Sequence, residues 1–180
     1  MALKATIFKI DLQIADMDRN YYAEHNLTLA RHPSETDARM MARVLMYALH
    51  AQEGIALTRG LSEADEPEIW VRDLTGRITL WIDIGQPDEA RLRKACGRAD
   101  QVIVLCHSSS CDLWWKQTER SLARLTNLSV LQLPVATGQA LAALAQRTMD
   151  LQCLVQDGEV WVSTGAQRVD VRLNPLKLAA

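Results

Sequence analysis

The sequence predicts a mixed α/β (α+β) fold in a single domain spanning residues 1–180. Its middle alternates short apolar runs with segments of helical spacing, an order that favours parallel strands joined by helices. Both ends carry hairpin signals, so we expect additional antiparallel strands from residues 1–32 and 149–174 to form one accessory sheet. Apolar residues make up 48% of the chain, enough for a sizeable core.

A hairpin and a long helix are the first expected elements. Apolar residues alternate through 3–14, the period of a half-buried strand, and 21–32 can pair back on that strand. Residues 34–54 then follow helical spacing. Ser34 is the expected N-cap of this helix, which places Glu35 in its first turn.

A second hairpin follows a short strand at 55–59 and an acidic loop, GLSEADEPE. Its strands, IWVRD and RITLWIDI, are joined by the short turn LTG, and the helix PDEARLRKACGRA begins at Pro87 or Asp88. Strand and helix then alternate through QVIVLCH, SCDLWWKQTERSLARL, LSVLQL and TGQALAALAQRTM. A DG turn in the tail indicates a last hairpin.

Composition excludes some classes of protein. A net charge of −2 argues against a protein that coats nucleic acid, because phosphate contacts require basic surfaces. No apolar run is long enough for a membrane helix, and charges interrupt the N-terminus, so we expect no membrane contact and a cytoplasmic location. The four cysteines are expected to be reduced. Cys106, His107 and Cys111 could suggest zinc, but a buried core residue is the better interpretation of Cys106.

Two carboxylates are expected to meet at the open end of the second hairpin. Counting from its turn places Asp73 near Ile78 and Glu68 near Asp83. Carboxylate oxygens, completed by water and a substrate phosphate, suit Mg²⁺ or Mn²⁺. Such a metal would activate water for phosphodiester hydrolysis.

Three further residues bear on this hypothesis. Lys94, about two turns into the next helix, could reach back and stabilise charge on a phosphate. Glu35 offers a third carboxylate for the metal. Gly85 leaves the strand position two residues beyond Asp83 without a side chain.

The order helix glutamate, strand glutamate, strand aspartate and lysine resembles the PD-(D/E)XK nuclease superfamily over residues 34–107. The resemblance assigns metal binding to Glu68, Asp83 and Glu35 and catalysis to Glu68, Asp83 and Lys94. It departs from the motif because Gly85 occupies the usual lysine position. In some members the lysine has moved to the following helix, which Lys94 would match.

A resemblance to the YaeQ family of bacterial proteins covers nearly the whole chain. It is carried by MALKATIF, LTLARHPSET, LTRGLSEADEPEIW, LWIDIGQPDE and RLRKAC. It implies a variant of the PD-(D/E)XK fold with additional strands. It implies no established substrate.

Structural roles compete with each functional assignment. Glu35 could favour the helix dipole, Glu66 or Asp65 could replace Glu68, and Lys94 could be solvated. Four cations at 91, 93, 94 and 98 could bind phosphate or form an outer helix face, and Trp115 could stack on a base.

Three functions follow from these alternatives. The first is a Mg²⁺-dependent nuclease or phosphodiesterase acting on nucleic acid. The second is a catalytically lapsed protein of that fold, serving as a regulatory module that binds nucleic acid or protein. The third is a structural partner protein without nucleic-acid contact. The sequence names no protein partner.

Overall fold

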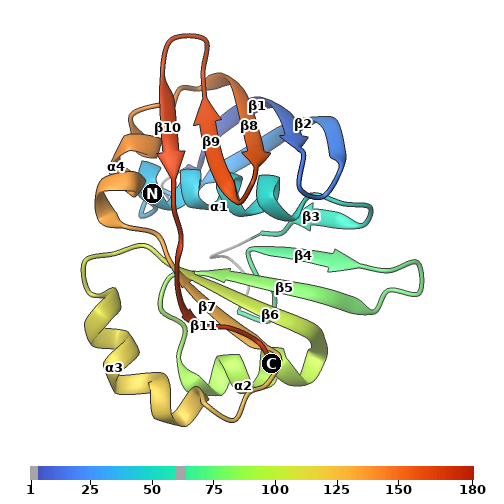
Figure 1. Cartoon of the computed structure of the whole chain (residues 1–180), viewed down its shortest axis with the longest axis vertical. Coiled ribbons are helices and arrows are strands. Elements are labelled where there is room, and N and C mark those ends of the chain that lie inside the picture. The colour runs from blue at the N-terminus through green and yellow to red at the C-terminus, as the bar shows by residue number, and fades with distance from the viewer. Residues whose placement is uncertain (1–3, 60–63) are drawn as a thin grey trace. The chain divides into compact units, whose positions relative to one another are not determined.

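The computed structural model describes residues 4–59 and 64–180, so residues 60–63 of the predicted acidic loop lie outside the described residues. The described chain is a mixed α+β protein with four helices and two sheets (Figure 1). It divides into two compact units. The first comprises the described residues up to 49 together with 136–172, and the second comprises 50–135 and 173–180. No helix in these ranges is long and apolar enough to cross a membrane.

The first unit contains a five-stranded sheet in the order β10-β9-β8-β1-β2 (Figure 1). Neighbouring strands are antiparallel except β1 and β8, which run parallel and join the two ends of the chain. The N- and C-terminal segments therefore supply additional strands to one sheet, as predicted. The strands are β1 (Thr6–Asp16), β2 (Tyr21–Arg31), β8 (Thr148–Gln156), β9 (Glu159–Ser163) and β10 (Arg168–Val171).

Helix α1 (Asp37–His50) runs along one face of this sheet (Figure 1). It begins later than predicted, because Thr36 rather than Ser34 caps it: the Thr36 Oγ1 accepts from the Arg39 amide at 3.1 Å. The Ser34 hydroxyl is bonded instead to His32 Nδ1 at 2.6 Å. The placement of Glu35 in the first helical turn is therefore wrong.

The helix predicted over TGQALAALAQRTM is also shorter than expected. Helix α4 (Val135–Ala142) ends early, and β8 begins at Thr148. Residues 148–155 pair in register with β1, more than 130 positions earlier in the chain. This pairing outweighs the local helix propensity of the alanine-rich segment.

The second unit contains a six-stranded sheet in the order β11-β7-β6-β5-β4-β3. Strands β5, β6 and β7 are parallel and are joined through α2 (Glu89–Arg98) and α3 (Cys111–Leu122), as the alternating pattern predicts. An edge strand that the sequence did not predict pairs antiparallel with β7. The strands are β3 (Ile55–Leu57), β4 (Ile69–Arg72), β5 (Ile78–Ile84), β6 (Ala99–Cys106), β7 (Leu128–Gln132) and β11 (Asn174–Lys177).

Helix α2 packs on the six-stranded sheet through a narrow apolar stripe. Leu92 and Ala95 are fully buried in a cluster that also contains Trp81 of β5 and Val102 of β6. The Asp88 carboxylate caps the helix by accepting from the Arg91 amide at 2.8 Å. The cap and the stripe together fix which side chains of α2 face β5.

Along the chain, the elements from α1 to β6 follow the order helix, three strands, helix, strand. This is the order that the resemblance to PD-(D/E)XK nucleases leads us to expect. Since α1 lies in the first unit and the strands in the second, the nuclease-like core over 34–107 stays a prediction.

Candidate functional site

Glu68 precedes β4 and Asp83 lies in β5, the strand that pairs with β4, and the meeting of their carboxylates stays a prediction. Ile69 pairs with Ile82, and the Glu68 amide, just before β4, donates to the Ile82 carbonyl at 3.0 Å. Both carboxylates are buried, with 6% and 3% of each residue exposed. Closer to the turn the prediction is wrong, because an irregularity after Val71 shifts the pairing by one residue.

Arg91 binds both oxygens of Asp83. Its Nε donates to Oδ2 at 2.8 Å and its Nη2 donates to Oδ1 at 2.9 Å. The same guanidinium donates to the carbonyls of Glu66, at 2.8 Å, and Ala64. The hydrogen bonds to Asp83 raise the pKa of Arg91, and the negative charge of Glu68 acts in the same direction. Arg91 is thus the cation bound to Asp83, and it lies near enough to Glu68 for that charge to act on it.

The aromatic ring of Trp81 lies next to this cation. Trp81 precedes Asp83 by two residues on β5, which places both side chains on the same face of the sheet. The Arg91 guanidinium lies 5.8 Å from the centre of its ring, and that of Arg98 lies 5.1 Å from it. Trp81 is 2% exposed, so a buried aromatic ring lies beneath both guanidinium groups.

Lys94 is directed to a different carboxylate from those of the predicted site. Its Nζ lies 2.5 Å from Asp65 Oδ1, and 62% of the lysine side chain is exposed. The hydrogen bond from Lys94 lowers the pKa of Asp65. The catalytic role assigned to Lys94 stays a prediction, and no contact of Lys94 with Glu68 or Asp83 supports it within the described residues.

Gly85 adopts a conformation that disfavours a lysine. Its φ is +120°, which L side chains rarely adopt, although an added Cβ would meet no atom within 4 Å. Open space is therefore available at the motif's usual lysine position, but the backbone there suits glycine.

Glu35 forms a separate ion cluster in the first unit. Arg43 Nε and Nη2 donate to its two oxygens at 2.8 and 2.7 Å, and Arg39 Nη1 donates to Oε1 at 2.9 Å. Glu35 and Arg43 are both buried. The assignment of Glu35 to the metal stays a prediction, while its observed partners are two arginines.

The donors present do not fit a divalent metal well. Such an ion needs free carboxylate oxygens, and both oxygens of Asp83 already accept hydrogen bonds from Arg91. In the ranges 4–59 and 64–180, no three His, Cys, Asp or Glu side chains are grouped so that they could hold a metal. Cys106 is 0% exposed, in agreement with its interpretation as a core residue, and burial raises the pKa of its thiol.

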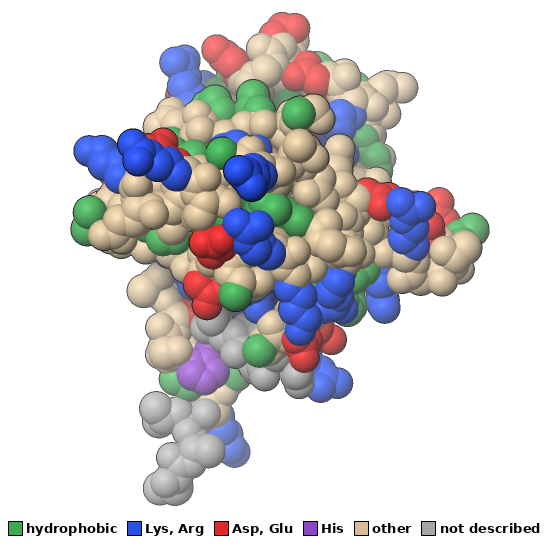
Figure 2. All heavy atoms as spheres, turned by 90° about the horizontal axis from the view of Figure 1, so that it is seen from below, with side chains coloured by type: hydrophobic (Ala, Val, Ile, Leu, Met, Phe, Trp, Pro, Cys, Tyr) green, Lys and Arg blue, Asp and Glu red, His purple; other side chains and the backbone are tan. Residues whose placement is uncertain are grey.

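The basic residues of α2 are engaged with acids and carbonyls. Arg93 pairs with Glu89 at 2.6 Å, and Arg98 donates to the Asp65 carbonyl at 2.8 Å. Figure 2 shows Lys and Arg side chains interspersed with Asp and Glu on the face that it displays. This mixture differs from the continuous basic surface typical of nucleic-acid binding.

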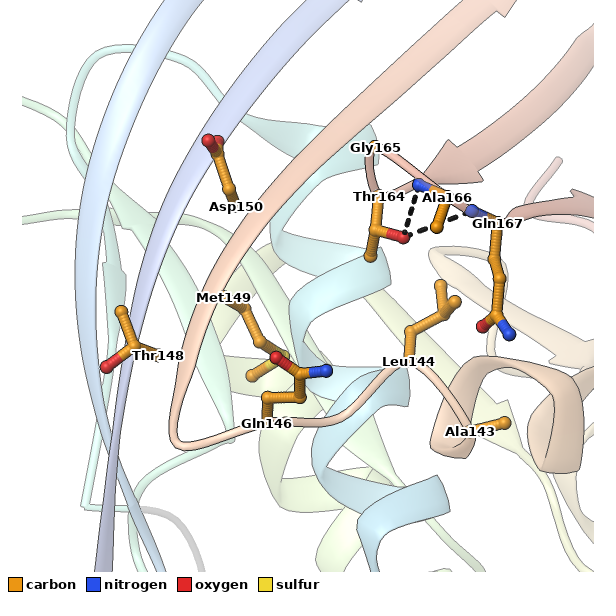
Figure 3. Close-up of a pocket in the computed structure, with 10 residues that line it drawn as sticks. All are labelled: Ala143, Leu144, Gln146, Thr148, Met149, Asp150, Thr164, Gly165, Ala166 and Gln167. Atoms are coloured by element: carbon orange, nitrogen blue, oxygen red, sulfur yellow. Dashed lines mark hydrogen bonds between the residues drawn. The ribbon is translucent and has the colours of Figure 1, made fainter.

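A separate hollow of about 400 Å³ lies in the first unit, between the segment that leads into β8 and the β9–β10 turn (Figure 3). The Thr164 hydroxyl closes that turn by accepting from the amides of Ala166 and Gln167. Gln146 and Gln167 supply neutral amide groups around the hollow, whereas the Asp150 carboxylate points away from the other side chains (Figure 3). The hollow therefore contains no charged group directed toward a ligand.

Comparison with known proteins places the chain in a family. A family model described as YaeQ protein matches residues 1–173. The chain belongs to the YaeQ family. The resemblance noted in the sequence is thereby confirmed.

Relatives match this YaeQ-family chain over nearly their full length. Proteins named "Uncharacterized protein YaeQ" from Salmonella typhi and Escherichia coli (strain K12) are 45% and 44% identical to it over 96% of each chain. The crystal structure of the YaeQ protein from Xanthomonas axonopodis pv. citri matches with a TM-score of 0.92 at 45% identity, covering 98% of this chain and 99% of that one. The YaeQ protein from Pseudomonas syringae has the same TM-score at 33% identity, with 97% of both chains covered.

Proposed function

We propose that this YaeQ-family chain is a catalytically lapsed protein of nuclease-like descent that works as a protein-binding module. The observation that carries the proposal is the Asp83–Arg91 pair. An arginine of the chain occupies the carboxylate oxygens that a catalytic Mg²⁺ or Mn²⁺ would need.

The charge balance of the site supports this proposal. Burying a carboxylate such as that of Asp83 is unfavourable unless a cation compensates it. Arg91 supplies that cation, and its planar guanidinium suits the two oxygens of Asp83. A metal would have to displace these two hydrogen bonds and also those to the carbonyls of Glu66 and Ala64.

Protein is favoured over nucleic acid as the partner. Affinity for nucleic acid depends largely on lysine and arginine side chains that are available to phosphates. All four cations of α2 already have partners within the chain: Asp83 for Arg91, Glu89 for Arg93, Asp65 for Lys94 and the Asp65 carbonyl for Arg98. The overall charge of −2 also disfavours the binding of nucleic acid.

Calorimetric titration with Mn²⁺ tests the proposal, with Arg91→Gln as the decisive variant. We expect no saturable binding by the wild type at millimolar metal. Arg91→Gln removes the internal cation, so we expect binding to appear, and to disappear again when Asp83→Asn is added. Arg93→Gln is the matched control, because it removes the same charge from the same helix while leaving Asp83 untouched.

The second candidate is a Mg²⁺-dependent nuclease acting on nucleic acid. The observation that favours it is that Glu68 and Asp83 are both buried and that the charges of both act on Arg91. Saturable Mn²⁺ binding by the wild type that Asp83→Ala abolishes would contradict the lapsed site and support this candidate. Single- and double-stranded DNA and RNA would then be screened for cleavage, with Asp83→Ala excluding contaminating nucleases.

A further inference from the structure

We propose that the outer face of the five-stranded sheet, the one opposite α1, docks a basic polypeptide segment with alternating apolar residues. This inference rests on the proposed binding function and assigns it a surface and a class of partner. It concerns the first unit and involves neither Asp83 nor Arg91.

The two faces of the sheet differ in what covers them. On the inner face, His25 of β2 bonds to Tyr47 of α1 at 2.9 Å, and alternate residues of β1 are buried. The outer residues of the same strands are exposed or half-buried. Within the described ranges, the outer face is therefore the open side of this sheet.

An apolar row crosses this open face. Tyr22 pairs with Ala15, Ala15 pairs with Leu154, and Leu154 pairs with Trp161, so four neighbouring strands contribute one residue each. Tyr22 is 59% exposed, which is unusual for a large aromatic residue away from an interface. A row of this kind offers anchors for the apolar side chains of a partner.

A hollow of about 380 Å³ lies along part of this row. The Arg168 guanidinium lies over the Trp161 ring, 5.3 Å from its centre, and holds the indole in place. Polar groups suited to main-chain hydrogen bonds lie beside it. These polar groups belong to Gln13, Gln152 and Ser163.

The charge of the face favours a basic partner, because its carboxylates outnumber its cations. The cations are Lys9, two residues before Asp11 on the same face of β1, and Arg168. Asp11 and Asp150 are paired on the neighbouring strands β1 and β8. Since neighbouring strands lie about 4.8 Å apart, the two like charges are close, and such a pair destabilises a sheet. Glu24 lies on the same face, and in the described part of the chain none of these three carboxylates belongs to an ion pair. By contrast, Arg168 is already paired with Asp170 at 3.2 Å.

Other occupants fit this face less well. Phosphates of a nucleic acid would be repelled by Asp11, Glu24 and Asp150. A second copy of the chain docked through the same face would bring identical carboxylates together. Lysine or arginine side chains of a different polypeptide would relieve the repulsion between Asp11 and Asp150.

Fluorescence anisotropy with labelled peptides tests this inference on the full chain. The probe is an alternating Lys-Leu peptide of about eight residues, which spans five strands spaced about 4.8 Å apart. We expect saturable binding, and a dissociation constant about tenfold larger for Asp11→Asn combined with Asp150→Asn. The matched control is Glu53→Gln combined with Glu119→Gln, an equal change of charge at exposed positions of the second unit.

Each alternative result is distinguishable. Absence of binding, equal weakening by both pairs of substitutions, or preference for a Glu-Leu peptide or single-stranded DNA would overturn the inference. Self-association in sedimentation that Trp161→Ala abolishes would also overturn it, in favour of a second copy. The aspartate substitutions remove like-charge repulsion, so their melting temperatures should equal or exceed that of the wild type. These results leave the outcome of the Mn²⁺ titration unaffected.

Discussion

Each unit contains a buried carboxylate whose two oxygens are bound by one arginine, and the two sites differ in how closed they are. In the first unit, Glu35 and Arg43 have side chains that are 2% and 5% exposed. In the second, the Asp83 side chain is 4% exposed but that of Arg91 is 30% exposed. The same pairing is therefore internal in one unit and reaches the surface in the other.

The two sites also differ in which charges surround the carboxylate and the arginine. Glu35 is shared by two arginines, Arg39 and Arg43. Arg91 instead serves Asp83 directly and is stabilised by the charge of Glu68. Loss of the Glu35 carboxylate therefore leaves the buried Arg43 without the partner that binds it through two hydrogen bonds, whereas loss of Arg91 frees both oxygens of Asp83.

The largest effect is expected from Glu35→Ala. It leaves Arg43 buried without its partner, and we expect a loss of about 3–5 kcal/mol in the free energy of unfolding. Urea denaturation followed by circular dichroism measures it. Asp37→Ala, which removes a carboxylate with a 44% exposed side chain, is the control and should change stability by less than about 1 kcal/mol. A loss equal to that of the control would show that the cluster is not structural.

A smaller loss is expected from Asp83→Asn. The shape is preserved, and the partly exposed Arg91 can turn toward water, so we expect a loss of about 1–3 kcal/mol by the same method. If Asp83→Asn lowers the free energy of unfolding more than Glu35→Ala does, then the exposure of the arginine does not explain the difference in stability between the two sites.

These two sites also mark how far the sequence can be interpreted. The pairing of Ile69 with Ile82, next to Glu68 and Asp83, agrees with counting along the hairpin, although the pairing at the turn is shifted by one residue. The count survives the irregularity after Val71 because the main strand pairs, such as Ile69 with Ile82, are set by burial. Burial therefore predicts the pairing of the apolar strand residues, whereas the pairing at the turn is not predicted correctly.

Pairings set by three-dimensional packing were not predictable in this way. Arg91 was recognised only as one of four cations, although the cap at Asp88 places it in the first turn of α2 and within reach of Asp83. The early end of α4 depends on β8 pairing with β1 from the opposite end of the chain. The position of Glu35 depends on a local choice instead: Ser34 and Thr36 are both suitable N-caps, and Thr36 is the one that caps α1.

Gly85→Ala tests whether the backbone conformation of Gly85, which lies between Asp83 and α2, requires glycine. The substitution forces a side chain onto a φ of +120° without any steric contact, so we expect a loss of about 1–2 kcal/mol from backbone strain alone. Gly97→Ala is a matched control within α2, because its added Cβ also meets no atom within 4 Å and its φ is ordinary. The control should gain about 0.5–1 kcal/mol. If both substitutions change stability equally, the conformation of Gly85 is not the constraint that keeps a lysine out of this position.

The smallest effect is expected from Lys94→Ala, and it separates a surface pair from a catalytic lysine. Lys94 and Asp65 have side chains that are 62% and 76% exposed, so Lys94→Ala should leave the free energy of unfolding nearly unchanged at neutral pH. The hydrogen bond from Lys94 lowers the pKa of Asp65 from 3.8, so the contribution of the pair is complete above that value and is lost as the pH falls through the lowered pKa. NMR titration of the Asp65 carboxyl should show its pKa rising toward 3.8 in Lys94→Ala, with Arg93→Ala as the control. A pKa of Asp65 that does not respond would mean that Lys94 is held elsewhere in solution, and a position beside Glu68 and Asp83 would then have to be reconsidered.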